Sequence, residues 1–208
     1  TWYLRDSNWS ADFPTSAAQA EWFLEKETGQ RVDGTIAVNL SLVKNLLAVV
    51  GPVELPEYKE KITAENLFER AEYYSEVDFF PGSTQKKSFL ASLANLLFER
   101  LKQLPPSSYL DLFARWEENL AQKDVLLAFH DKTLQEKIRA LGWNGEIRKV
   151  SFTKTADFSG PGVVDYLAVV DANVGVNKAN YFLTREIEYE ATILKEGQLV
   201  NQLTLVYH

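Results

Sequence analysis

The sequence predicts an α/β protein in which helices cover a mixed sheet and a C-terminal antiparallel β-hairpin extension follows. Three observations lead to this fold class. Residues 32–55 place an extended apolar run, a helical apolar pattern and a second extended run in succession. Further segments up to residue 142 carry apolar residues at helical spacing. From residue 163 onward, apolar and polar residues alternate as they do in strands with one wet face.

The centre of the predicted sheet is a strand, a helix and a strand in succession. Gly51 and Pro52 end the helix, because glycine is preferred where a helix ends with positive φ and proline cannot continue it. This succession predicts a βαβ half-unit whose two strands lie parallel in one sheet. The predicted strands are residues 35–38, 53–55 and 125–129, and the predicted covering helices are residues 17–26, 42–49, 64–75 and 86–102.

Two further regions complete the first part of the chain. Residues 56–61 are expected to form a charged loop. A helix is expected over residues 107–120, and its inward-facing residues are Leu110, Phe113, Trp116 and Leu120.

Composition changes at residue 150. The chain is therefore expected to divide into an α/β domain, residues 1–150, and a β-rich C-terminal extension, residues 151–208. The strands expected in the extension are residues 163–170, 181–194 and 199–207, with a hairpin turn at residues 195–198.

Composition also limits the function classes. The chain has 208 residues, of which 46% are hydrophobic, enough for one full core with or without a smaller appendage. A net charge of -7 argues against a nucleic-acid partner, because binding to phosphate backbones depends on a basic surface. There is no cysteine, and the two histidines, His130 and His208, are too few for a histidine-rich zinc site.

No segment has the composition of a membrane anchor. No stretch approaches the roughly 20 apolar residues of a membrane span, and no signal peptide is visible. The chain begins at Thr1 without methionine and stops in the middle of a strand pattern. We therefore expect it to be cut from a longer protein, whose anchor or signal lies in the missing parts.

Two polar clusters are candidates for a site. Arg5 and Asp6 follow a short extended piece, and ligands of α/β sheets usually sit just past the ends of strands. The alternative is an ordinary ion pair that closes a loop. Lys86 and Lys87 stand in the first turn of a long helix, where cations oppose the helix dipole and suggest an anion site. The alternative there is a solvated helix start. No phosphate loop, serine-nucleophile elbow or other local enzyme motif occurs.

Several segments together resemble the bacterial domain-of-unknown-function family 4012. These segments are RDSNWSADFPTSAAQAEWF, ETGQRVDGTIAVN with VVGPVEL, LGWNGEI, and VDANVGVNKANYFLTREIEY. The resemblance covers nearly the whole chain and implies a membrane-anchored parent protein with this domain outside the cytoplasm. No reaction has been assigned to the family. By this resemblance, we expect the family's earlier strands and its anchor to be missing from this chain.

The layout is also similar, more distantly, to the LytR-CpsA-Psr family, whose members transfer lipid-carried anionic glycopolymers to peptidoglycan. The similarity rests on a helix ending at Gly29, then residues 32–33, residues 37–39, a helix, and residues 50–54. It implies that Arg5 and Asp6 are catalytic, that Asp6 holds Mg²⁺, and that Lys86 and Lys87 bind phosphate. The family's later arginines fall near Glu72 and Tyr74 and near residues 85–87, where only the lysines are basic.

Two function classes therefore stay open. The first is a non-catalytic surface or scaffold module of the cell envelope, with other envelope proteins as partners. The second is a binder or phosphotransferase of polyprenyl-(pyro)phosphate-linked glycopolymer, in which Arg5 and the lysines hold phosphate oxygens and Asp6 holds Mg²⁺. Any membrane contact would come through parts of the parent protein that are not present. A concave apolar pocket beside Arg5 and Asp6 favours the second class, and a filled core favours the first.

Overall fold

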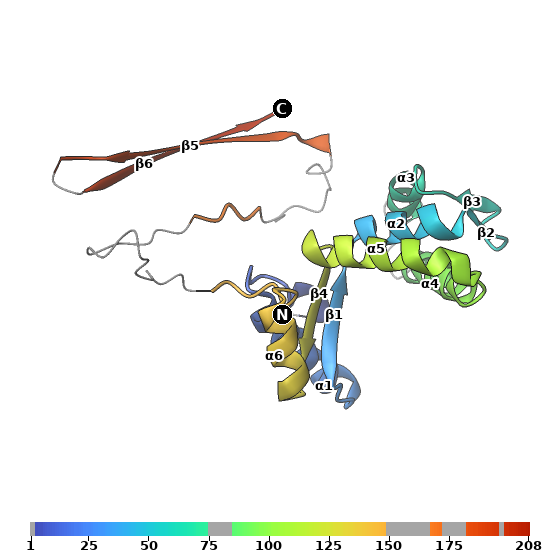
Figure 1. Ribbon diagram of the computed structural model, residues 1–208. Coiled ribbons are helices and arrows are strands. Elements are labelled where there is room, and N and C mark those ends of the chain that lie inside the picture. Colours follow the sequence, from blue (N-terminus) through green and yellow to red (C-terminus); the bar gives the residue numbers. More distant parts are fainter. Residues whose placement is uncertain (1–2, 75–84, 149–166, 172–181, 196–197) are drawn as a thin grey trace. The chain divides into compact units, whose positions relative to one another are not determined.

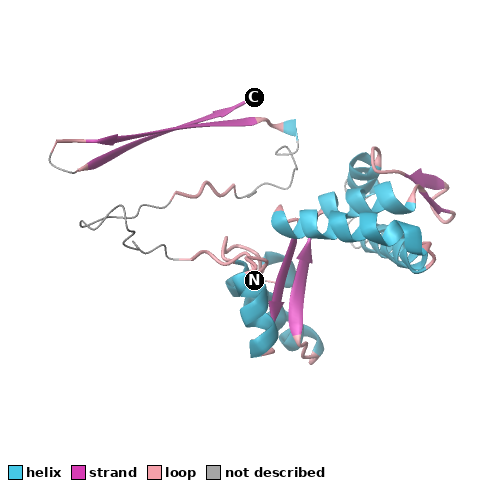
Figure 2. Cartoon of the chain, in the orientation of Figure 1, coloured by secondary structure: helices cyan, strands magenta, loops and turns pink. Residues whose placement is uncertain are grey.

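The described residues form a mixed α/β structure with small antiparallel sheets. The computed structural model describes residues 3–74, 85–148, 167–171, 182–195 and 198–208, without the side chains of Arg5 and residues 85–88. The chain divides into two compact units, Thr1–Gly162 and Val163–His208 (Figures 1 and 2). The boundary predicted at residue 150 lies outside the described residues and stays a prediction.

The first sheet of unit 1 consists of two strands that are far apart in sequence. Strand β1 (Gly34–Val38) pairs antiparallel with β4 (Val125–Phe129), so that Ile36 lies opposite Leu127. Helix α1 (Phe13–Thr28) packs on both strands and α6 (Lys132–Ala140) packs on β4 (Figure 1). Gly34 permits the pairing, because a Cβ there would meet the carbonyl oxygen of Ala128 at 2.4 Å. Both strands were predicted from the sequence.

The predicted βαβ half-unit, and with it the mixed sheet, is wrong. Helix α2 (Leu40–Val50) begins after Asn39 and ends at Gly51, which has a φ of 79°. However, β2 (Val53–Leu55) pairs antiparallel with β3 (Glu60–Ile62), and β1 is not its neighbour. The physical reason is the turn at residues 56–59, which closes a hairpin over far fewer residues than a parallel crossover requires. The predicted charged loop is therefore this turn and the first two residues of β3.

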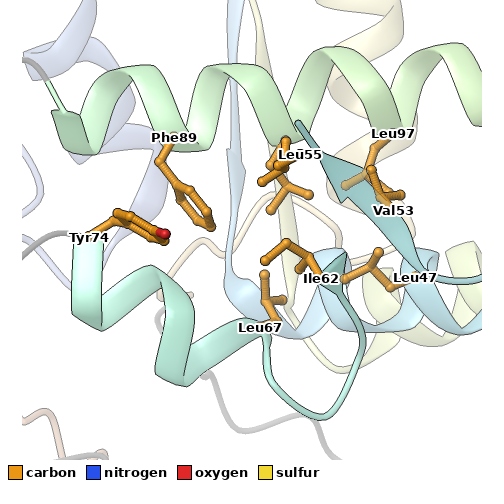
Figure 3. Packing of buried hydrophobic residues seen from close by; sticks show 9 residues of the cluster. Leu47, Val53, Leu55, Ile62, Leu67, Tyr74, Phe89 and Leu97 are labelled. Carbon is orange, nitrogen blue, oxygen red and sulfur yellow. The ribbon is translucent and has the colours of Figure 1, made fainter. Parts of the chain in front are cut away.

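A hydrophobic core lies between the β2–β3 hairpin and three helices. Helix α3 (Leu67–Glu72) and helix α4 (Gln85–Lys102) close it together with α2 (Figure 3). The rings of Tyr74 and Phe89 stack with centroids 4.7 Å apart, and Tyr58 meets both edge-on. Burial raises the pKa of the Tyr74 phenol, and the nearby Glu60 carboxylate raises it further. The buried members of this core are Leu47, Val53, Leu55, Ile62, Leu67, Tyr74, Phe89, Leu93 and Leu97.

Helix α5 (Tyr109–Ala121) is oriented differently from the prediction. It follows a short 3-10 turn, η3 (Pro106–Ser108). Leu120 is buried as expected, but Leu110 is 82% exposed and Phe113 is 73% exposed. The reason is Asn119, which is fully buried and accepts a hydrogen bond from the Asn45 amide of α2 at 3.0 Å. This polar contact turns the helix so that much of its apolar side faces solvent. The expectation that Leu110, Phe113 and Trp116 face inward is therefore wrong.

The start of α1 is joined to the last described segment of unit 1 by Asp12. Its carboxylate accepts hydrogen bonds from the Thr15 hydroxyl at 2.6 Å, the Thr15 amide at 3.1 Å and the Ile147 amide at 2.9 Å. The Thr15 hydroxyl is the main cause that lowers the Asp12 pKa; burial opposes this, and the backbone amides of Ile147 and Thr15 add to it. Asp12 is thus both a helix N-cap and a link across 135 residues.

Unit 2 is the predicted hairpin. Strand β5 (Arg185–Ile193) pairs antiparallel with β6 (Leu199–Tyr207) along their whole length. Residues 167–170 form no strand, so the prediction of a strand there is wrong, and residues 163–166 and 196–197 lie outside the described residues. Asp171 instead contacts the Arg185 guanidinium and accepts a hydrogen bond from the Tyr207 hydroxyl at 3.0 Å. The described residues of this unit bury almost no side chain.

Candidate functional site

The predicted catalytic pair lies in a short turn beside α1. Arg5 and Asp6 belong to a 3-10 turn, η1 (Leu4–Asp6), and the Asp6 carboxylate accepts a hydrogen bond from the Tyr3 amide at 3.0 Å. The Leu4 amide donates to the Glu27 carboxylate at 3.2 Å, which ties this turn to the end of α1. The side chain of Arg5 lies outside the described residues. Its role in catalysis stays a prediction.

The predicted phosphate ligands stand at the start of α4. Lys86 and Lys87 occupy its first turn, and their side chains also lie outside the described residues. Arg70, the nearest arginine before them, is already paired, because its guanidinium lies 3.4 Å from the Glu60 carboxylate of β3. Whether Arg5 and the two lysines converge on one phosphate is therefore untested.

The magnesium assignment rests on a single carboxylate. Among the residues that the structure describes, no group of three or more His, Asp or Glu side chains is placed to hold a metal ion. Mg²⁺ is commonly held by one or two carboxylates together with phosphate oxygens of a substrate. Asp6 would have to act in this way, with one of its oxygens already accepting from Tyr3. Mg²⁺ at Asp6 stays a prediction.

An apolar groove of about 520 Å³ lies between α2 and α4. Its volume is within the range of ligand pockets. Asn39 is the one polar side chain in the lining, and both ends of its amide are used: the oxygen accepts from the Leu42 amide at 3.2 Å and the nitrogen donates to Asp124 at 2.5 Å. We call this the α2–α4 groove; it is lined by Val38, Asn39, Leu40, Leu42, Val43, Leu46, Leu90, Leu93, Ala94, Leu97, Phe98 and Leu101.

The α2–α4 groove does not lie beside the predicted catalytic pair. A pocket next to Arg5 and Asp6 was named as the observation that favours lipid binding, and none of the groove-lining residues comes from η1. The groove does adjoin the other half of the predicted site in sequence, since Leu90 follows Lys87 by one helical turn.

A second apolar surface covers one face of the β5–β6 hairpin. Residues opposite each other in an antiparallel pair share a face, so the register places three apolar cross-strand pairs on one side. We call this the hairpin apolar face: Ile187 with Leu205, Tyr189 with Leu203, and Ile193 with Leu199, with Ala191 and Asn201 between the last two pairs. The opposite face carries Glu186, Glu188 and Glu190. All six residues of the apolar pairs are exposed.

Sequence reasoning missed the α2–α4 groove and the exposed side of α5. A usable signal was present in α4, where apolar residues recur at positions 89, 90, 93, 94, 96, 97, 98 and 101. That arc is wider than one core contact needs, which indicates that the helix has a second apolar neighbour or groove. No comparable signal marks α5, whose orientation depends on one buried amide pair.

The fold and these surfaces define a mixed α/β protein with an amphipathic C-terminal hairpin and an apolar interhelical groove. Among the described residues, no helix has the combination of length and hydropathy that a bilayer crossing demands. Residues 1–74 of the 208 match the family described as "Protein of unknown function (DUF4012)", which confirms the resemblance seen in the sequence over that stretch. No curated protein and no solved structure matches the chain.

Proposed function

We propose that this chain is a non-catalytic interaction module of the cell envelope, located outside the cytoplasm. The observation that carries the proposal is the hairpin apolar face. Its six large apolar side chains are exposed on one side of a two-stranded sheet. Contiguous apolar surface of this kind marks protein–protein contact sites in soluble domains.

Energetics support a partner for this face. An isolated two-stranded hairpin is marginally stable in water, and three or more strands or a packed helix are needed for independent stability. Among the described residues, β5 and β6 pair only with each other, and a partner that covers Tyr189 and its neighbours would supply further apolar burial. The opposite face carries three glutamates together with Val200 and Val206, so it is the more polar of the two faces. The partner we propose is another envelope protein with an apolar surface of its own.

The proposal is tested by photo-crosslinking in cells that make the protein. A photo-reactive amino acid is placed at Ile193, on the hairpin apolar face, and in a matched control at Thr192, the next residue along β5 on the opposite face. We expect a discrete protein adduct from position 193 and several-fold less from position 192. Equal labelling from the two positions, or no adduct from either, contradicts the proposal.

A second candidate is favoured by the α2–α4 groove. A groove with an almost wholly apolar lining suits an isoprenoid chain, and α4 begins with two lysines suited to an anionic head group. In this alternative, which follows the LytR-CpsA-Psr resemblance, the chain binds a polyprenyl-(pyro)phosphate-linked glycopolymer or transfers its phosphate. Arg5 and Lys86 or Lys87 hold the phosphate oxygens, and Asp6 holds Mg²⁺.

Calorimetry with a short-chain polyprenyl pyrophosphate and Mg²⁺ separates the two candidates. Phe98→Asp places a charge in the groove at an exposed position, and Leu141→Asp is the matched control because Leu141 is similarly exposed outside the groove. Lipid binding predicts at least tenfold weaker affinity for Phe98→Asp and no change for Leu141→Asp. Arg5→Ala should remove a charged hydrogen bond of about 1.5–3 kcal/mol. An absence of binding by the unchanged chain eliminates this candidate.

A further inference from the structure

Unit 1 carries an exposed apolar row on α5 as well as the α2–α4 groove. The outward row consists of Tyr109, Leu110, Phe113 and Trp116, whose spacing of i, i+1, i+4 and i+7 forms one stripe of a helix. All four side chains are exposed. Burial in an apolar groove would remove the outward row from water, and an apolar occupant would do the same for the lining of the α2–α4 groove.

The shape of the groove fits a helix. Its α4 lining residues recur at positions 90, 93, 94, 97, 98 and 101, the spacing with which one helix receives the side chains of another. These positions span roughly 17 Å along the axis of α4, about the length of α5. Asn39 is the one polar side chain of the lining and its amide is already hydrogen-bonded at both ends, so the lining has little with which to orient a polar small molecule.

The α5 helix of the same chain does not fill the groove. The hydrogen bond between Asn45 and Asn119 fixes its rotation about its own axis. Its polar row of Asp111, Arg115 and Glu118 lines the space beside Ala48 and Val49 of α2, while the outward row is exposed. Among the described residues of unit 1, none fills the groove, which leaves it open to an occupant from another molecule.

We propose that two copies of this chain associate reciprocally, with the outward row of each copy seated in the α2–α4 groove of the other. At roughly 150–250 Å² for a full aromatic side chain, the outward row leaves about 400–500 Å² exposed. One contact then buries about 800–1,000 Å² from both copies, below the size of a stable interface, and two reciprocal contacts bury about 1,600–2,000 Å², which is within it. Neither surface contains a charged side chain, so no charge is buried.

Sedimentation of the whole chain over a range of concentrations measures the association. We expect a monomer–dimer equilibrium that Phe113→Asp weakens by at least ~30-fold, as loss of a central aromatic anchor does. The matched control is Leu141→Asp, which places the same charge at an exposed apolar position of unit 1 outside the outward row and the α2–α4 groove, and should leave the equilibrium unchanged. A monomer at ~100 µM, or a dimer sensitive to Leu141→Asp and not to Phe113→Asp, overturns the proposal.

Crosslinking tests the reciprocal pairing directly. The chain contains no cysteine, so single cysteines report without background. Leu110→Cys, on the outward row, is mixed with Ala94→Cys, in the groove, and treated with a short bismaleimide. The control mixture is Leu110→Cys with Gln19→Cys. We expect the yield of mixed dimer to be several-fold higher from the first mixture than from the control. Equal yields from the two mixtures, or a small apolar molecule retained in the groove by native mass spectrometry, overturns the proposal. These readouts are independent of the hairpin apolar face and of its partner.

Discussion

Replacing Phe113 by alanine distinguishes the observed orientation of α5 from the one that the sequence pattern predicts. With Phe113 facing inward, the loss would be about 3–5 kcal/mol of unfolding free energy, the usual cost of a buried phenylalanine. In the structure the residue is 73% exposed. About a quarter of the side chain is then buried, so alanine removes about a quarter of a full burial energy of roughly 1.5–3 kcal/mol, or roughly 0.4–0.8 kcal/mol of unfolding free energy. The higher helix propensity of alanine offsets much of it.

The assay is urea unfolding followed by tryptophan fluorescence. All five tryptophans lie before residue 150, so the signal reports unit 1 alone. Measurement at ~1 µM avoids stabilisation by self-association, which acts by mass action. We expect Phe113→Ala to change the free energy of unfolding by less than about 0.5 kcal/mol, the range of surface substitutions.

Asn119→Ala is the counterpart that should be costly. It leaves the Asn45 amide without its acceptor in a half-buried position, for a loss of about 1–3 kcal/mol. A double-mutant cycle with Asn45→Ala should give a coupling of about 0.5–1.5 kcal/mol. A loss above ~2 kcal/mol for Phe113→Ala together with no coupling between the asparagines would refute the observed orientation of α5.

The remaining predictions concern the core, the pH dependence and the first sheet. Leu93→Ala should lower the unfolding free energy by about 2–5 kcal/mol, because Leu93 is buried. Leu46→Ala should lower it by clearly less, because Leu46 is half-buried and borders the groove. Urea unfolding measures both. The pKa of Asp12 is lowered by folding, so its stabilisation is present above the unfolded pKa of about 3.9 and is lost as pH falls through the lower folded pKa. Asp12→Asn should therefore flatten the loss of stability between roughly pH 5 and 3, followed by unfolding midpoints. Gly34→Ala should separate β1 from β4 and cost at least about 1–3 kcal/mol in thermal or urea unfolding.

Each of these predictions has its own contradictory outcome. Equal losses at Leu93 and Leu46 would mean that the groove is filled rather than open. An acid transition that is unchanged in Asp12→Asn would mean that other carboxylates control it. Gly29→Ala is the control for Gly34, because a Cβ at Gly29 meets nothing within 4 Å and only its φ of 72° is strained. A larger loss at Gly29 than at Gly34 would contradict the close approach of β1 and β4.

Local signals predicted the elements of this protein well. Asn39 and Gly51 set the ends of α2, Asp131 begins α6, and the alternation from residue 185 gives β5 and β6. These features depend on neighbours within a few residues, through caps, positive φ and side-chain periodicity.

Pairing and helix orientation could not be predicted in this way. β1 pairs with β4, which lies far along the chain, whereas β2 pairs with β3 through a short turn. The apolar content of the strands fits these pairings and the predicted parallel pairing of β1 with β2 equally well. The orientation of α5 depends on Asn119 meeting Asn45, a contact that no periodicity contains. Of the candidate site, Arg5, Lys86 and Lys87 were selected by their places after an extended piece and in the first turn of a helix, and their roles came from a family resemblance. Their side chains lie outside the described residues.

The link between Asp12 and Ile147 has a consequence for the order in which unit 1 forms during synthesis. Chains emerge from the N-terminus, so α1 emerges long before residues 145–147. Those residues supply two contacts to the start of α1: the Ile147 amide donates to Asp12, and the Gly145 carbonyl accepts from the Phe13 amide. β1 likewise waits for β4. The hairpin of β2 and β3 and the helices around it need only local contacts and can close early. The first part of unit 1 to emerge is therefore the last to be secured, and it stays available to chaperones until residue 147 has emerged.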